Sequence, residues 1–91
     1  MNEEARKNEI AVKVSFPISK HGPFQYDFAP GAIVGTVLGL AMGHFEVEND
    51  SQFVYVLAHD GLEQEPATTL GTLAGHAKSL HFTLVKKITQ G

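Results

Sequence analysis

The sequence predicts an α+β roll in which four or five strands pack on one α-helix. Three observations lead to this prediction. Apolar and polar residues alternate over residues 10–16, as on a strand with one buried face. Apolar residues recur at helical spacing over residues 34–45. A second alternation, over residues 80–85, follows near the end of the chain, so the last strand is expected to complete the sheet.

The first half of the chain predicts a hairpin followed by the helix. Residues 17–23 contain two prolines and a glycine, which are turn formers, and Phe24, Tyr26 and Phe28 then alternate with polar residues. Two strands joined by a loop of this length are expected to pair antiparallel. Pro30 ends the second strand, and the helix is expected to begin at Gly31 or Ala32 and to run to about Phe45.

Three glycines, Gly35, Gly39 and Gly43, fall on the helix side opposite the apolar stripe. Each glycine inside a helix costs about 1 kcal/mol relative to alanine. We interpret them as tolerated in a helix held by tertiary packing, in preference to a smooth surface for close approach of another backbone.

The second half predicts three further strands and a short helical turn. The apolar run Phe53–Leu57 predicts a strand buried deep in the sheet. Asp60-Gly61 is a turn signal, after which Leu62 begins a short edge strand. A single helical turn capped by a threonine and anchored by Leu70 and Leu73 precedes the last strand.

The predicted organisation is one small domain with a flexible segment at each end. Residues 1–9 are expected to form a flexible leader, residues 10–85 the domain and residues 86–91 a flexible tail. The polar leader does not have the pattern of a secretory signal. The uncharged run 29–45 is shorter than the roughly 20 residues that a membrane span needs, so we expect a cytoplasmic protein without a membrane partner.

Composition argues against several classes of function. A formal charge of -3, with only seven basic residues, does not favour nucleic-acid binding. The absence of cysteine removes thiol chemistry, and the five histidines lie in different predicted elements without metal-ligand spacing. His59 and Asp60 are adjacent, so their side chains are expected to point apart on an extended chain. We therefore expect no enzyme, no metal and no cofactor.

Several short motifs resemble the ubiquitin-like β-grasp family. Phe28-Ala29-Pro30 lies where a proline separates the second strand from the helix in ubiquitin. Thr69-Leu70, followed by Ser79-Leu80-His81, is similar to a ubiquitin turn and the start of its final strand. Leu62 resembles the leucine of the short fourth strand. The resemblance extends over residues 10–89 and implies a mixed sheet packed on one helix.

The resemblance implies a protein modifier that is not itself an enzyme, of the kind found among the divergent ubiquitin-like proteins of bacteria. Such a modifier is joined to target amines through its terminal glycine carboxylate, here Gly91. The implied partners are an activating enzyme, a conjugating enzyme, a JAB-type protease and target proteins. The implied sheet-surface contacts are Val54 and Thr83, and the implied tail recognised by enzymes consists of Lys86, Lys87, Ile88, Thr89 and Gln90.

One departure from the family leaves alternatives open. Conjugated members and sulfur carriers usually end in two glycines, whereas this sequence has Gln90-Gly91. A β-grasp adaptor that binds partners without conjugation, and a sulfur carrier whose Gly91 becomes a thiocarboxylate, are the alternative functions. Lys86 and Lys87 are either a solubilising end to the strand or a docking handle for an acidic partner.

Overall fold

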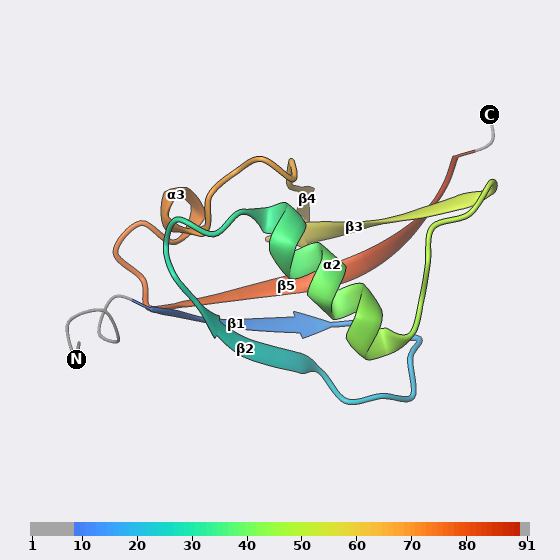
Figure 1. The fold of residues 1–91 in the computed structure, drawn as a ribbon, viewed down its shortest axis with the longest axis horizontal. Helices are drawn as coiled ribbons and strands as arrows, with labels where there is room; N and C mark the ends of the chain where they lie inside the picture. Colours follow the sequence, from blue (N-terminus) through green and yellow to red (C-terminus); the bar gives the residue numbers. More distant parts are fainter. Residues whose placement is uncertain (1–8, 90–91) are drawn as a thin grey trace.

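The structure, a computed structural model, describes residues 9–89 (Figure 1). Its elements follow the order that the sequence predicts: two strands, a helix, a strand, a two-residue strand, a short helix and a final strand. Their bounds are β1 Ile10–Ser15, β2 Phe24–Phe28, α2 Val34–Phe45, β3 Phe53–His59, β4 Leu62–Glu63, α3 Leu70–Ala74 and β5 Ser79–Ile88.

The strands form one mixed sheet in the order β2-β1-β5-β3-β4. β1 pairs antiparallel with β2 and parallel with β5, and β5 pairs antiparallel with β3. The short β4 adds to β3 at Ala58 and His59 only. The predicted α+β class, the hairpin and the five-stranded mixed sheet are confirmed. The last strand of the chain therefore lies at the centre of the sheet, between β1 and β3.

One face of the sheet packs against α2, which crosses it as Figure 1 shows. Alternate residues of β1 and β5 point to this face, and the buried side of α2 meets them. The sheet face opposite α2 is called the outer face below. The buried core consists of Ile10, Val12, Val14, Phe16, Phe28, Val34, Val37, Ala41, Phe45, Tyr55, Leu57, Leu70, Leu80, Phe82 and Leu84.

The helix begins at Val34, later than the predicted start at Gly31 or Ala32. Ile33 has extended backbone angles and forms an antiparallel bridge with Thr69. The carbonyl oxygen of Ala32 accepts a hydrogen bond from the amide of Leu70 at 2.8 Å. The prediction is wrong because these residues pair with the segment that leads into α3, and this non-local pairing holds them extended.

A close approach of backbone to the helix occurs at Gly35. A Cβ atom added there would lie 3.3 Å from both Cβ and the carbonyl oxygen of Pro66, and the Gly35 amide donates to that oxygen at 2.9 Å. A Cβ added at Gly39 or Gly43 would meet no heavy atom within 4 Å. Close approach of the backbone at Pro66 therefore explains Gly35. Our interpretation that all three glycines are merely tolerated is wrong for this one.

The short helix α3 agrees with its predicted cap and anchor. Thr69 is the N-cap residue, and its side chain accepts a hydrogen bond from the amide of Thr72. Leu70 is fully buried, and Leu73 packs against the core. The threonine cap satisfies one of the amide donors that the first helical turn leaves unpaired.

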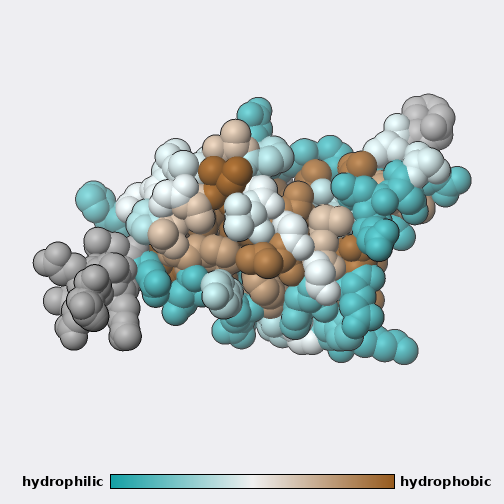
Figure 2. All heavy atoms as spheres, in the orientation of Figure 1, coloured by the Kyte–Doolittle hydropathy of each residue, from teal (hydrophilic) through white to brown (hydrophobic). Residues whose placement is uncertain are grey.

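The solvent side of α2 has no acidic or basic residue other than His44 and carries both apolar and polar side chains. Figure 2 shows hydrophobic residues gathered over the middle of the molecule on this side, with hydrophilic residues around them. Leu40 on α2 is 48% exposed, and Ile33 before it is 38% exposed. Scattered exposed apolar residues of this kind are common on small domains.

Candidate functional site

The sequence predicts that a flexible tail begins at Lys86. In the structure, β5 stays paired with the sheet beyond this residue. β5 continues through Ile88, and its last residues lie opposite the first residues of β3. Lys86 pairs with Tyr55, and Ile88 pairs with Phe53. The boundary at residue 86 is therefore corrected: alternation of apolar residues stops near Val85, but backbone pairing with β3 continues.

The turn before β3 also binds the residue after β5. The amide of Thr89 donates to the carbonyl oxygen of Gln52 at 2.9 Å, and its hydroxyl donates to the carbonyl oxygen of Ser51 at 3.2 Å. Residues 49–55 and 86–89 are called the β3–β5 clasp below. Gly91, the predicted conjugation site, and Gln90, a predicted tail-recognition residue, lie outside the described residues.

Two side chains of the turn satisfy the amides of β3 that point away from β5. Oδ1 of Asp50 accepts from the amides of Gln52 and Phe53, each at 2.8 Å. Oδ1 of Asn49 accepts from the amide of Tyr55 at 2.9 Å. Because β4 pairs with β3 only at its far end, these side chains take the place of a neighbouring strand at its near end.

Hydrogen bonding sets the charge state of Asp50. The amides of Gln52 and Phe53 lower the pKa of this carboxyl below its ordinary value of 3.8, and the nearby charge of Lys86 lowers it further. Both causes stabilise the carboxylate form, which accepts hydrogen bonds. Asp50 therefore remains a carboxylate to a lower pH than an aspartate without these hydrogen bonds.

Both lysines of the clasp have partners within the chain. Nζ of Lys86 lies 4.1 Å from the centre of the Phe53 ring, a cation–π contact. Nζ of Lys87 lies 2.7 Å from Oε1 of Glu63, an exposed ion pair between β5 and β4. Each lysine is itself exposed, so these contacts add to the pairing of the strand end with modest energies.

The outer face carries Val54 and Thr83, the two predicted contact residues, but at separate positions. Val54 pairs with Lys87, whereas Thr83 pairs with Ala58 four residues further along β3. Between them Val56 lies directly opposite Val85, and both side chains are half-buried. The apolar part of this face is therefore Val54, Val56 and Val85, with Thr83 beside it.

Sequence reasoning missed Val56 and Val85 because it interpreted the run Phe53–Leu57 as a strand buried deep in the sheet. Only one face of β3 packs against the core, through Tyr55 and Leu57. The prediction of deep burial is thus wrong for the alternate residues. An apolar run of five residues is compatible with burial of one strand face or of both. Among residues 9–89, no second layer covers the outer face, so only one face of β3 is buried.

Solved structures with the same arrangement can be found, although no family model and no curated protein matches the sequence. A ubiquitin from Caldiarchaeum subterraneum superimposes with a TM-score of 0.71 at 23% identity, over 91% of this chain and 99% of that chain. ATG8 from Trypanosoma brucei gives a TM-score of 0.70 at 9% identity, over 97% of this chain and 81% of that chain. A protein designed de novo on the basis of ubiquitin gives 0.65 at 18% identity, over 92% and 94% of the two chains.

The chain has the ubiquitin-like β-grasp fold. The match covers nearly the whole of both chains for the archaeal ubiquitin, so the resemblance read from short motifs is confirmed at the level of the fold. At these identities the comparisons establish the fold alone. The expectation that the protein is not an enzyme and the roles assigned to individual residues remain predictions.

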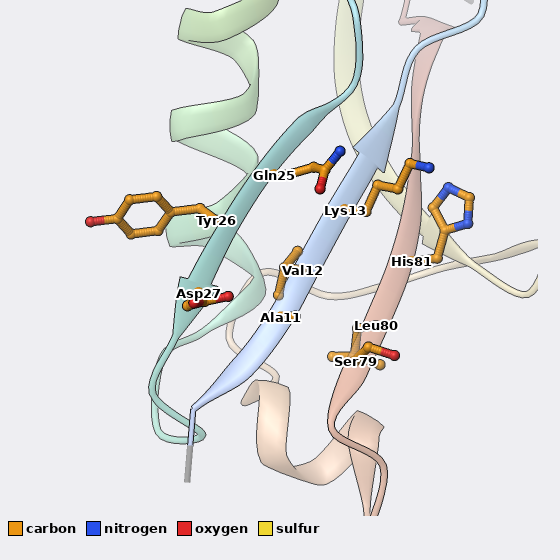
Figure 3. Close-up of a pocket in the computed structure, with 9 residues that line it drawn as sticks. All are labelled: Ala11, Val12, Lys13, Gln25, Tyr26, Asp27, Ser79, Leu80 and His81. Carbon is orange, nitrogen blue, oxygen red and sulfur yellow. The ribbon is translucent and has the colours of Figure 1, made fainter. Parts of the chain in front are cut away.

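A shallow groove of about 240 Å³ lies on the outer face of this ubiquitin-like sheet, across β2, β1 and β5 (Figure 3). Lys13 and His81 are direct neighbours across β1 and β5, and Asp27 lies on β2. Nε2 of His81 is 2.8 Å from Oγ of Ser15, whereas the Tyr26 side chain points away from the groove. The groove combines charged and polar side chains with apolar surface, whereas the valine pair further along β5 is wholly apolar.

Two histidines of the ubiquitin-like domain lie close together, with 6.0 Å between the ring centres of His21 and His44. Among residues 9–89, no group of three His, Asp or Glu side chains is arranged to hold a metal ion. The His59 and Asp60 side chains do approach each other, with 3.6 Å between Nε2 and Oδ2, contrary to the expectation that they point apart. Asp60 adopts a left-handed conformation, φ 54°, in the turn after β3, which folds its side chain back. No helix in the same described range is long and apolar enough to cross a membrane.

Proposed function

We propose that the chain is a ubiquitin-like protein modifier that is activated at the carboxylate of Gly91 and joined to amines of target proteins. The observation that supports this proposal best is the course of β5 within the ubiquitin-like fold. β5 is a central strand, yet it extends beyond the helix to an exposed end of the molecule (Figure 1). Gln90 and Gly91 follow that end in the sequence.

The proposed chemistry needs a chain end without a bulky side chain. The Gly91 carboxylate attacks the α-phosphorus of ATP on the activating enzyme, and pyrophosphate leaves. An enzyme thiolate then displaces AMP to form a thioester, and a target amine displaces the thiolate. Glycine suits this role because the absence of Cβ lets its carboxylate pass a narrow channel.

The proposed partners follow from this chemistry. They are an activating enzyme, a conjugating enzyme, target proteins and a JAB-type protease that reverses the linkage. We place the system in the bacterial cytoplasm, where ATP is available to the activating enzyme. Lys86, Lys87, Ile88, Thr89 and Gln90 are the proposed recognition residues before Gly91.

Intact mass spectrometry tests the modifier proposal. The chain is incubated with a candidate activating enzyme and Mg-ATP, and the masses of the free chain and of the enzyme are measured. The expected products are an AMP adduct of the chain and a thioester on the enzyme, both lost when Gly91 is deleted. No adduct from the intact chain, or an undiminished adduct after the deletion, would contradict the proposal. Exchange of one oxygen for sulfur in the presence of a sulfur donor would instead identify a sulfur carrier.

A second candidate function is a non-conjugated adaptor, which the valine pair on the outer face favours. Val56 and Val85 meet across β3 and β5 and are half-buried, although among residues 9–89 no second layer covers them. A partner docked there would complete their burial. The test is a pull-down with the wild-type chain, the double variant Val56→Lys/Val85→Lys and a chain ending at Val85. Capture that the lysines abolish and the truncation preserves would support the adaptor.

A further inference from the structure

The residues that an activating enzyme would have to engage are held by the sheet itself. Three successive pairs join the clasp strands: Lys86 with Tyr55, Lys87 with Val54, and Ile88 with Phe53. Thr89 adds its two hydrogen bonds to Gln52 and Ser51 beyond the last pair. These contacts lie at the exposed end of β5, away from the helix-covered core.

Chain length makes this pairing matter for the proposed chemistry. The two residues after Thr89 can span at most about 7 Å when fully extended. If residues 86–89 leave β3, six residues become free, and they span about 20 Å. A carboxylate that must reach the end of a narrow channel gains this distance only when the clasp opens.

The pairing is partial on β5, which favours reversible opening. The bond from Thr89 to Gln52 shows that residues 87 and 89 direct their amides toward β3, so those of Lys86 and Ile88 point the other way. β1 pairs with β5 only as far as Thr83, so it does not cover that side. Half of the backbone groups in the clasp are therefore bonded across the sheet, and Ile88 is 72% exposed.

We propose that the β3–β5 clasp is an autoinhibitory contact that must open before Gly91 can enter the active site of an activating enzyme. This inference rests on the proposed function of Gly91. The turn of Asn49 and Asp50 controls the clasp because it fixes β3 in the conformation that β5 pairs with. A partner that binds this turn, or that competes for β3, would regulate activation.

Hydrogen exchange measured by NMR tests whether the clasp is closed in the free protein. The expected result is protection of the Lys87 and Thr89 amides, with fast exchange at Lys86 and Ile88. Asp50→Ala removes the acceptor in the turn and is expected to lower the Lys87 and Thr89 protection by about fivefold, the factor for one net hydrogen bond. Glu48→Ala removes a carboxylate from the same loop and should leave the protection unchanged. Equal exchange at all four amides of the wild type would overturn the inference.

An engineered disulfide tests whether opening controls access to the chain end. Phe53 and Ile88 face each other as a pair whose backbone groups are not bonded to one another, the geometry in which Cα atoms come close enough for a disulfide. The chain has no cysteine, so Phe53→Cys/Ile88→Cys introduces one defined crosslink that can be reduced in the same sample. The reduced form controls for the substitutions themselves.

Carboxypeptidase Y serves as a narrow active site that receives a chain end, and intact mass spectrometry follows the trimming. The wild type is expected to lose Gly91 and Gln90 quickly and the next residues slowly. The oxidised double variant should stop near Thr89, while its reduced form and Asp50→Ala should be trimmed toward Lys86. Trimming of the oxidised and reduced forms at one rate would overturn the inference. Failure of the proposed function is separate, because it appears as a wild-type chain that an activating enzyme does not adenylate.

Discussion

The Thr89 amide donates a 2.9 Å hydrogen bond to the carbonyl oxygen of Gln52, which ties the last described residue to the turn before β3. The contact joins residues 37 positions apart, and it extends β5 pairing beyond the apolar alternation that marks the strand in the sequence. The end of β5 that carries the proposed recognition residues is therefore part of the sheet up to Thr89, and the strand has a buried part and an exposed part.

The buried part of β5 is expected to determine stability. Leu84 is 2% exposed and pairs with Leu57, so Leu84→Ala should lower the free energy of unfolding by about 2 to 5 kcal/mol. Ile88→Ala, at a residue 72% exposed on the same strand, should change it by less than about 0.5 kcal/mol. Urea denaturation followed by circular dichroism measures both. Similar losses for the two variants would contradict the division of the strand.

Two helix glycines should respond oppositely to the same substitution. Gly39→Ala places Cβ in open space and should stabilise the domain by about 1 kcal/mol, the difference in helix propensity. Gly35→Ala brings Cβ to 3.3 Å from Pro66, so a shift of that loop should cancel the gain. Thermal unfolding of the two variants compares them directly. A gain at Gly35 equal to that at Gly39 would show that the Pro66 contact is not restrictive.

The Thr69 side chain is expected to stabilise the segment that pairs with the start of α2. Thr69→Ala removes the N-cap oxygen of α3 and should cost about 1 kcal/mol of unfolding free energy. Thr69→Ser keeps an oxygen at the same position and should restore most of the loss. Chemical denaturation of the three proteins gives the comparison, and a serine variant as unstable as the alanine variant would assign the effect to packing of the methyl group.

The clasp turn should depend on pH through Asp50. Because hydrogen bonds from Gln52 and Phe53 lower its pKa in the folded chain, the stabilisation is complete above the ordinary value of 3.8. It is lost as pH falls from there through the lowered pKa, when the carboxylate is protonated. A ¹³C NMR titration of the Asp50 carboxyl should give a midpoint below 3.8. A midpoint at or above that value would show that the amide hydrogen bonds do not form, and Asp50→Asn should remove the titration.

The fold could be predicted from sequence because its elements have strong local signals. Alternation in β1 and β5, the Asp60-Gly61 turn and the threonine cap of α3 each agree with the tertiary structure. The errors occur where long-range pairing overrides local pattern. Ile33 is extended because it pairs with Thr69. The helical pattern predicts a start before Ile33 because it contains no sign of this pairing.

The candidate site was less predictable for the same reason. Lys86, Lys87 and Ile88 have no apolar alternation, so the sequence indicated a free tail, yet their backbone groups pair with β3. Val56 and Val85 become neighbours only when two distant strands are placed side by side. Side-chain pattern identifies which face of a strand is buried, but it does not indicate how far backbone pairing continues into polar residues.

The side chains of Asn49 and Asp50 have one further consequence for the molecule in a crowded solution. An open strand margin offers its amides to any extended chain that meets it, which is how β proteins join edge to edge and aggregate. Here the amides of Phe53 and Tyr55 are already occupied by oxygens from the preceding turn. The same two residues that fix the start of β3 therefore also protect its open edge against unwanted self-association.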